Sequence, residues 1–235
     1  MKEKTAEEYF EWLRKFEQKY TTDECYTPPA VYEEIKEYVV KFFGLEGKTI
    51  ERPFYPNGDY KKAAESYDEN TVVIDNPPFS LTAEIIKTYQ ALGVRFFLFT
   101  QMKTALHHVD KGVSVWFMPH NIIYDRGIRV CTAFLTNLEK EQCIRTIPNL
   151  IKPQSNGKKS KNSYPENLYI ASHFQRLSKA GNAFMIPISP EMIRRTYVDE
   201  KRGKVQIYGG GVELPSGEYK KYIEELRPEK SDDDE

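Results

Sequence analysis

The segment TVVIDNPPFS, residues 71–80, is a short apolar run that stops at two consecutive prolines. Residues 72–74 are β-branched and apolar throughout, which predicts a strand buried on both faces, as in a parallel sheet. Pro77 and Pro78 cannot donate to a strand ladder, so the strand should end by Asn76. A residue that precedes a proline is pushed out of the helical region, so the chain should continue as a stiff, extended loop. Open α/β sheets bind their ligands at such carboxyl ends of strands.

Three groups of this loop suit a planar ligand that carries an amine. The Asn76 side chain and the Pro77 backbone each offer a carbonyl oxygen as acceptor, and Pro77 has no competing N–H. Phe79 adds a flat apolar face on which a ring could stack. The alternative interpretation is a loop that ends a strand and happens to contain two prolines.

The sequence Asn76-Pro77-Pro78-Phe79 resembles the Asn-Pro-Pro-aromatic motif of amino-group methyltransferases that use S-adenosylmethionine. The resemblance implies that these four residues are catalytic. In that family the Asn side chain and the following proline carbonyl hold the target amine, and the aromatic residue stacks on the base. The strand before the motif and the helix expected after it match the context that the motif requires.

The composition is that of a soluble globular protein, with 40% hydrophobic and 29% charged residues. A net charge of −1 provides no overall attraction to a polyanion, so nucleic-acid binding would need a local basic patch. The three cysteines are odd in number and widely spaced, which favours neither a disulfide framework nor a zinc site. The charged, amphipathic N-terminus does not resemble a signal peptide, and no apolar run is long enough to span a membrane. We therefore expect a cytoplasmic protein without a bound metal.

Two helices are expected before the first strand. Residues 5–19 carry an apolar stripe, and this helix should pack on the outside of the core, with partner docking as the alternative. Thr27 is predicted as the N-cap and Pro28 as the first position of a helix that continues to residue 43. Tyr26, Thr27 and Pro28 also resemble the methyltransferase segment whose Thr and Pro line the methionine end of the cofactor, which implies cofactor contacts here.

A strand beginning at residues 48–50, a turn around Gly58 and a helix-prone segment at residues 61–67 predict the first unit of a cofactor-binding α/β fold. The glycine permits a tight turn and close backbone approach, although an ordinary Asn-Gly turn is the alternative. The order resembles the methyltransferase glycine loop, but an arginine stands where an acidic residue is common and one of the usual two glycines is missing. The resemblance implies cofactor contacts from Arg52, Pro53, Phe54, Gly58 and Asp59.

The segment between Tyr60 and Thr71 has room for one short helix only. A complete fold of the family would insert there a second strand, ending in an acidic residue that holds the cofactor ribose, and then a third strand. Either the sheet is trimmed, or the ribose is held by another residue, Asp59 or Asp75, with Asn76 as a further cofactor contact. This departure leaves open a descendant that has lost catalysis.

Further elements follow the motif: a helix over residues 81–92, a buried parallel strand over 94–99, and two strands over 113–117 and 129–135. The loop between the last two strands carries Tyr124. The resemblance implies that Phe79 and Tyr124 wall the pocket of a flipped base. A plain packing role for Tyr124 is the alternative.

Two basic groups lie in the last third of the chain. Lys158, Lys159 and Lys161 form an exposed basic loop, and Arg194 and Arg195 belong to a second group. Phosphate contact is the functional interpretation and a solvated charge run is the alternative. The glycines at 209–211 predict a strand or hairpin that is interrupted there.

The order of motifs most resembles the EcoRI-like adenine-specific DNA methyltransferases of phages, mobile elements and restriction-modification systems. The resemblance covers about residues 20–140. It implies an α/β fold with a Rossmann-like methyltransferase sheet, either complete or trimmed. The expected division is an N-terminal amphipathic helix (1–20), a catalytic core (21–140), a target-recognition and DNA-contact region (141–229) and a disordered acidic tail (230–235).

The expected activity is transfer of a methyl group from S-adenosylmethionine to the 6-amino group of an adenine flipped out of double-stranded DNA. Asn76 and the Pro77 carbonyl would accept the two N–H bonds of the amine and turn its lone pair toward the methyl group. Positioning would supply most of the rate. The alternatives are another amine, such as a cytosine 4-amino group, an RNA base or a protein glutamine, or a catalytically inactive DNA-binding descendant.

Overall fold

The computed structural model describes residues 26–55, 58–124, 127–147, 164–165, 167–179 and 185–214. The expected N-terminal helix, the basic loop with Lys158, Lys159 and Lys161, and the acidic tail lie outside the described residues. Within the described ranges, no helix is long and apolar enough to cross a membrane.

Seven strands form the main sheet. Their order across it is β1 (Thr49–Glu51), β2 (Thr71–Asp75), β3 (Arg95–Gln101), β7 (Thr132–Thr136), β4 (Ser114–Phe117), β8 (Cys143–Thr146) and β10 (Met185–Pro187). β1, β2 and β3 are parallel, whereas β7 runs antiparallel between β3 and β4. β8 is parallel to β4, and β10 is an antiparallel edge strand. The fold is therefore α/β, and its parallel start is consistent with a Rossmann-like arrangement.

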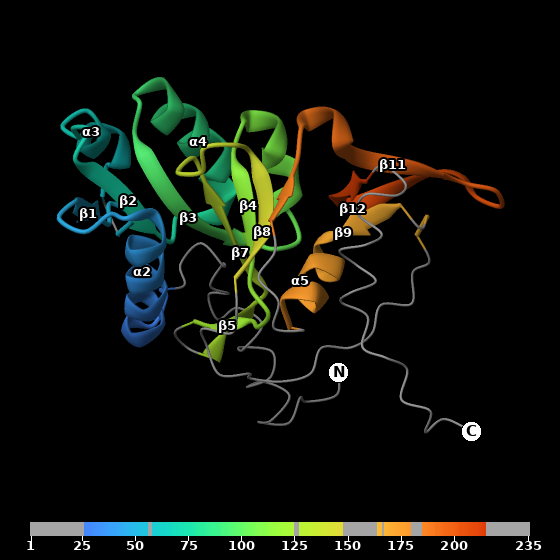
Figure 1. Ribbon diagram of the computed structural model, residues 1–235, viewed down its shortest axis with the longest axis horizontal. Helices are drawn as coiled ribbons and strands as arrows, with labels where there is room; N and C mark the ends of the chain where they lie inside the picture. Colours follow the sequence, from blue (N-terminus) through green and yellow to red (C-terminus); the bar gives the residue numbers. More distant parts are fainter. Residues whose placement is uncertain are drawn as a thin grey trace, which may run out of the picture.

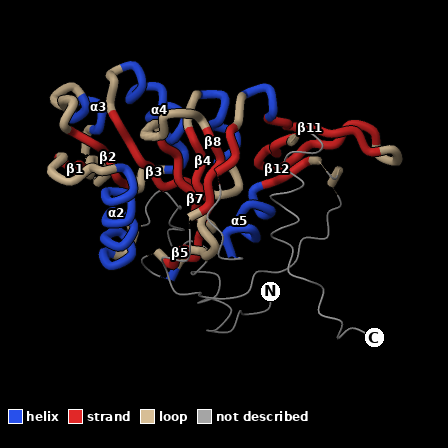
Figure 2. The backbone as a smooth tube through the Cα atoms, viewed as in Figure 1, coloured by secondary structure: helices blue, strands red, loops and turns tan. Residues whose placement is uncertain are grey.

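Helices cover both faces of this sheet (Figures 1 and 2). On one face α2 (Pro29–Phe43) packs in an apolar cluster with Val72 and Ile74 of β2. On the other face a second cluster contains Val73, together with residues of α3 (Tyr60–Ala64), α4 (Thr82–Ala91), the 3-10 helix η3 (Ala105–Lys111) and α5 (Ala171–Lys179). Because successive β2 side chains point to opposite layers, all five residues of the strand are buried, as predicted.

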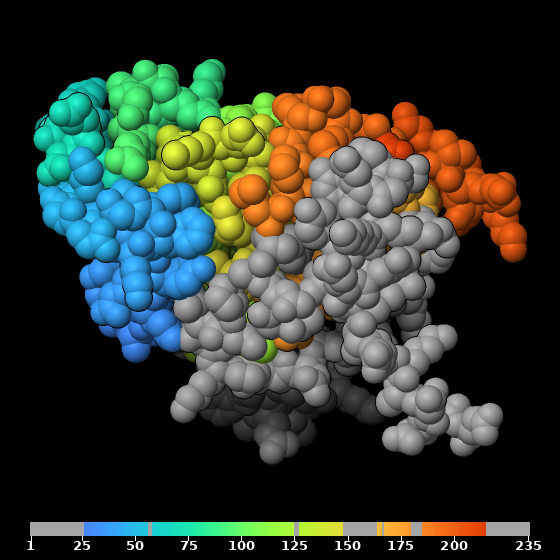
Figure 3. Space-filling model, viewed as in Figure 1, coloured from blue at the N-terminus to red at the C-terminus, as the bar shows by residue number. Residues whose placement is uncertain are grey.

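A smaller sheet follows in the C-terminal part of the described chain. β11 (Ile193–Asp199) and β12 (Gly203–Glu213) form an antiparallel hairpin, and β9 (Leu168–Ile170) pairs with the end of β12. The hairpin projects from the main sheet, at the end opposite α2 and β1 (Figures 1 and 3). We call residues 193–208 of this hairpin the ribbon.

Three expected elements differ in detail. The helix after β1 ends at Ala64 rather than at residue 67, and there the Ser66 hydroxyl donates to the Ala63 carbonyl (2.7 Å). The strand expected over residues 129–135 is divided at Cys131, whose carbonyl accepts from the Met102 N–H (2.7 Å), so that β6 (Arg129–Val130) pairs separately with β5 (Ile122–Ile123). At the glycines the pairing of β11 with β12 shifts register between Arg194–Gly211 and Thr196–Gln206, so the expected interruption is a bulge within β12, which itself continues to Glu213.

Candidate active site

The carboxyl ends of five strands, β1, β2, β3, β4 and β8, lie along one edge of the main sheet. β1, β2 and β3 are parallel, and β4 runs in the same direction because both β3 and β4 are antiparallel to β7. The loops after β1, β2 and β4 therefore lie along the same edge, and they contain most of the residues that the sequence singled out. This is the edge at which open α/β sheets bind ligands.

Asp75, the last residue of β2, joins two of these loops. Its carboxylate is 2% exposed and accepts hydrogen bonds from the Arg52 Nε (3.2 Å) and from the Phe54 backbone N–H (3.0 Å). Burial raises the pKa of Asp75, while the hydrogen bonds from Phe54 and Asn76 N–H groups and the charge of Arg52 limit that rise. Both carboxylate oxygens are thus used to tie the loop after β1 to the end of β2.

Arg52 also contacts α2. Its guanidinium carbon lies 3.6 Å from the centre of the Tyr32 ring, and the Tyr32 hydroxyl donates to the Ile74 carbonyl (2.9 Å). An acidic residue at position 52 would place a second carboxylate against Asp75, and each would disfavour ionisation of the other. The arginine found where the family has an acidic residue therefore has a structural explanation in this chain.

The Asn76-Pro77-Pro78-Phe79 loop leads directly into helix. Pro77 is buried, and the Pro78 carbonyl accepts from the Leu81 N–H (3.0 Å) as a 3-10 turn, η2 (Phe79–Leu81), begins. The side-chain oxygen of Asn76 is buried, although the residue as a whole is partly exposed. Phe79 is half-buried and packs against the apolar cluster under α2.

Tyr124 belongs to that same apolar cluster, so the structure brings Phe79 and Tyr124 to one face of the sheet. Tyr124 is only 2% exposed, and its hydroxyl lies 3.2 Å from Thr132 Oγ1. Its backbone N–H donates to the Ile128 carbonyl (2.8 Å) and closes the loop. Its packing role is therefore established, and a role as a pocket wall stays a prediction.

Thr27 does not cap α2, contrary to expectation. The helix begins at Pro29, the capping position is Pro28, and no side chain caps it. Thr27 is 5% exposed, and its Oγ1 has no hydrogen-bond partner among the residues that the structure describes. A buried hydroxyl without a partner costs free energy, so its position is consistent with a ligand that completes its hydrogen bonding. The neighbouring Tyr26 is exposed.

Gly58 and Asp59 have roles within the loop itself. A Cβ at Gly58 would lie 2.8 Å from the Pro53 carbonyl oxygen, so the turn requires glycine whether or not a ligand is bound. One carboxylate oxygen of Asp59 accepts from the N–H groups of Lys61 and Lys62 (both 3.1 Å) and caps α3. The two acidic candidates for a ribose, Asp59 and Asp75, thus both have partners in the chain.

Two buried tyrosine hydroxyls near Asp75, those of Tyr67 and Tyr89, were not predicted from the sequence to be of functional interest. In the described part of the chain, neither the Tyr67 nor the Tyr89 hydroxyl has a hydrogen-bond partner. Burial is the main cause that raises the pKa of Tyr67 to about 12 and the pKa of Tyr89 further, and the nearby Asp75 charge adds to both. Aromatic residues at helical spacing predict core packing, so the sequence carried no signal for these polar atoms.

The two arginines predicted to bind DNA are engaged in ion pairs. Arg194 Nε lies 2.5 Å from Glu213 Oε2, and Arg195 Nη2 lies 3.2 Å from Asp110 Oδ2 on η3. All four side chains are at least 38% exposed, so these pairs are solvent-screened. DNA contact by either arginine stays a prediction.

Within the described ranges, no group of three His, Cys, Asp or Glu side chains is arranged to hold a metal ion. No protein-family model matches the chain, and neither a curated protein nor a solved structure matches it significantly. Function is therefore inferred from the geometry at the carboxyl edge of the sheet and from the resemblance of its motifs.

Proposed function

We propose that the chain is an S-adenosylmethionine-dependent methyltransferase that acts on the 6-amino group of adenine in double-stranded DNA. The observation that carries the proposal is the position of the Asn76-Pro77-Pro78-Phe79 loop. This loop follows a strand that is buried on both faces. It lies at the sheet edge where the loops after β1 and β4 also begin. Asp75 ties it to the loop after β1, so the two halves of the proposed site are held together.

The target amine would be held by acceptors of the β2 loop. The Asn76 side-chain oxygen and the Pro77 carbonyl accept its two N–H groups, and Phe79 stacks on the ring. An adenine inside a duplex cannot be surrounded in this way, so the base must leave the helix. Since the rigid loop fixes the direction of the lone pair, positioning supplies most of the rate and no strong general base is needed.

The residues around Thr27 fit a polar cofactor. Thr27 and Pro28 would line its methionine end, and the buried Thr27 hydroxyl gains a partner when the cofactor binds. Phe54, whose backbone is fixed by Asp75 and whose ring packs on the opposite face of the sheet from α2, would contact the cofactor from that face. When bound, S-adenosylmethionine supplies a methyl group that is already activated for transfer.

A second candidate is a methyltransferase-like protein that binds DNA without catalysis. Two observations favour it: β1 is an edge strand of the described sheet, and both Asp59 and Asp75 are engaged within the chain. The ribose of a bound cofactor would have to share the Asp59 or Asp75 carboxylate with the N–H groups that these carboxylates already accept from. Calorimetry with S-adenosylmethionine separates the two candidates, because the inactive descendant gives no binding heat with or without DNA.

The decisive experiment incubates the full chain with labelled S-adenosylmethionine and mixed-sequence duplex DNA, followed by nucleoside analysis. We expect label on the adenine 6-amino group, and Asn76→Ala should lower the rate by on the order of 100-fold or more. Asn70→Ala is the matched control, because it removes the same side chain just before the other end of β2. Label on cytosine would assign a different amine, and a normal rate for Asn76→Ala would refute the site.

A further inference from the structure

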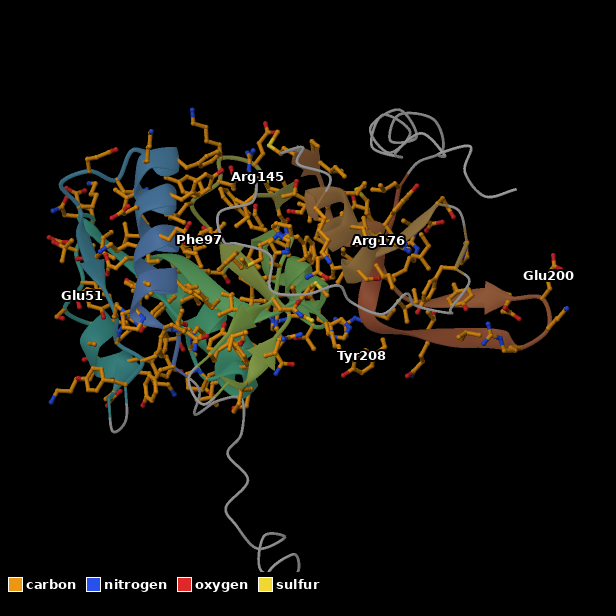
Figure 4. The ribbon with its side chains drawn as sticks, turned by 90° about the horizontal axis from the view of Figure 1, so that it is seen from below. Glu51, Phe97, Arg145, Arg176, Glu200 and Tyr208 are labelled. Carbon is orange, nitrogen blue, oxygen red and sulfur yellow. The ribbon has the colours of Figure 1, made fainter. Side chains whose placement is uncertain are left out.

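The ribbon carries a surface that the methyl-transfer site does not use. Figure 4 places Glu200 at its tip, far from Glu51 at the other end of the molecule, and Tyr208 at its root. Five basic and two acidic side chains lie between residues 193 and 208, in a chain whose net charge is −1. The ribbon is therefore a locally basic arm on a nearly neutral protein.

One face of the ribbon is open to solvent. Val198 is 80% exposed and pairs across the strands with the exposed Lys204. Gln206 and Tyr208, which is 77% exposed, continue the same face toward the root. The alternate residues are shielded, and among them the Tyr197 ring lies 5.6 Å from the Tyr164 ring. The exposed face thus combines an aromatic, an aliphatic and two polar side chains in line.

The charges at the tip are only partly neutralised. Asp199 accepts from the N–H groups of Lys201 (3.0 Å) and Arg202 (2.9 Å) and forms an ion pair with the Arg202 side chain (3.1 Å). Across the described ranges, Lys201 and Lys204 have no carboxylate partner. Arg194 and Arg195, in contrast, each form an ion pair with a carboxylate.

The root of the ribbon packs on the segment that follows β3. Gly209 approaches the turn that follows β3 so closely that a Cβ there would lie 1.6 Å from the Lys103 carbonyl oxygen. Gly210 packs on the His107 ring in the same way, at 3.0 Å. The turn at Lys103 follows β3, the strand that pairs with β2, and η3 packs on the face of the sheet opposite Phe79.

We propose that the ribbon enters the major groove of duplex DNA, with Lys201 and Lys204 on phosphates and Val198 and Tyr208 facing the groove; this rests on the proposed function. The major groove of B-form DNA is about 12 Å wide and admits a two-stranded ribbon, and an apolar side chain there can contact a thymine methyl group. Lysines on phosphates fix the position of such an element.

The same features disfavour other nucleic acids. The deep, narrow major groove of A-form RNA does not admit a ribbon. Single strands are held by several aromatic platforms along a basic groove, whereas Tyr208 is the one exposed aromatic on the described face of the ribbon. Duplex DNA is therefore the partner that the shape and charge of the ribbon fit best.

The test measures binding of the full chain to labelled duplex DNA by fluorescence anisotropy over a range of salt concentrations. The variant Lys201→Ala/Lys204→Ala should bind at least about tenfold more weakly, and the slope of log affinity against log salt should fall by about 2. Lys87→Ala/Lys140→Ala removes the same charge from exposed sites on α4 and on the turn before β8, and it should bind as the native chain does.

Three results would overturn the ribbon assignment: unchanged binding by the Lys201/Lys204 variant, equal weakening by the control variant, or tighter binding of duplex RNA than of duplex DNA. Its failure can be told apart from failure of the proposed function. At saturating DNA the Lys201/Lys204 variant should regain the native rate of methyl transfer, whereas Asn76→Ala should bind duplex DNA normally and transfer methyl groups on the order of 100-fold more slowly. Circular dichroism of each variant checks that the exposed substitutions leave the fold intact.

Discussion

The end of β2 and the root of the ribbon are fixed by different means. At the end of β2, side chains form directional hydrogen bonds: Asp75 accepts from Arg52 and Phe54, and Tyr32 donates to Ile74. At the root of the ribbon, backbone packs on backbone, with Gly209 against the Lys103 carbonyl. Arg195 and Asp110 form an exposed ion pair there, and Ile193 and Val212 pack in the apolar cluster that includes η3.

This difference matches what each region has to do under the proposed function. Directional bonds hold the β2 loop in one orientation, which a site that aligns a lone pair with a methyl group needs. Close packing at a single root fixes where the ribbon starts and leaves its basic tip exposed for a partner. The stability of the end of β2 should thus depend on hydrogen bonds between polar atoms. The stability of the ribbon root should depend on Gly209 having no Cβ.

The largest expected effect is at the root. Gly209 has a φ of +81° and no space for a Cβ, so Gly209→Ala combines backbone strain with a clash against a carbonyl. We expect a loss of roughly 3–4 kcal/mol in the free energy of unfolding, measured in urea. Gly203→Ala is the control in the same hairpin, since its φ is +71° but nothing lies within 4 Å, and it should lose only about 1 kcal/mol. Equal losses would mean that the root is not closely packed.

Asp75 tests the polar region through pH. Its folded pKa is raised, so the folded state keeps this proton where the unfolded state, with a pKa of about 4, releases it. The stability from this group is complete below that value and falls as the pH rises through the folded pKa. Asp75→Asn has no such titration, so its free energy of unfolding relative to the native chain should increase from pH 4 upward.

Asp75→Asn also shows whether burial or the charge of Arg52 has the larger effect on the pKa of Asp75. If the relative stability of Asp75→Asn decreases from pH 4 upward, the Arg52 charge outweighs burial and the folded pKa is lowered. Urea unfolding at intervals of pH measures the difference directly. Asp75→Ala at neutral pH should lose about 2 kcal/mol, because the Phe54 N–H is left without its acceptor.

The buried strands were predictable from the sequence. Residues 72–74 and 96–99 are apolar without alternation, and a run of this kind can be buried only if both of its faces are covered. The structure confirms parallel pairing of β2 with β3 and burial of all of β2. This part of the fold depends on local sequence, so it needed no knowledge of distant contacts.

The polar contacts depend on residues that are distant in the sequence. Arg52 and Asp75 are 23 positions apart, and Arg195 meets Asp110 across 85 positions. From the sequence, Arg52 was predicted to contact the cofactor and Arg195 to contact DNA. The carboxylates that they meet instead are too distant along the chain to be predicted as partners. The glycines at 209–211 were expected to interrupt a strand, but the requirement for Gly209 could not be predicted, because the Lys103 carbonyl that leaves no room for a Cβ there comes from another element.

The smallest expected effect compares two buried tyrosines. Tyr32 is 2% exposed and Tyr89 is fully buried, but only Tyr32 has a hydroxyl partner, the Ile74 carbonyl. Tyr32→Phe should therefore lose about 1 kcal/mol in the free energy of unfolding, whereas Tyr89→Phe should change it by less than about 0.5 kcal/mol or increase it. Urea unfolding of both variants measures the difference. An equal loss in the two variants would mean that the Tyr89 hydroxyl forms a hydrogen bond with an ordered water. The polar atoms around Tyr89 would then be held by hydrogen bonds, as those at the end of β2 are.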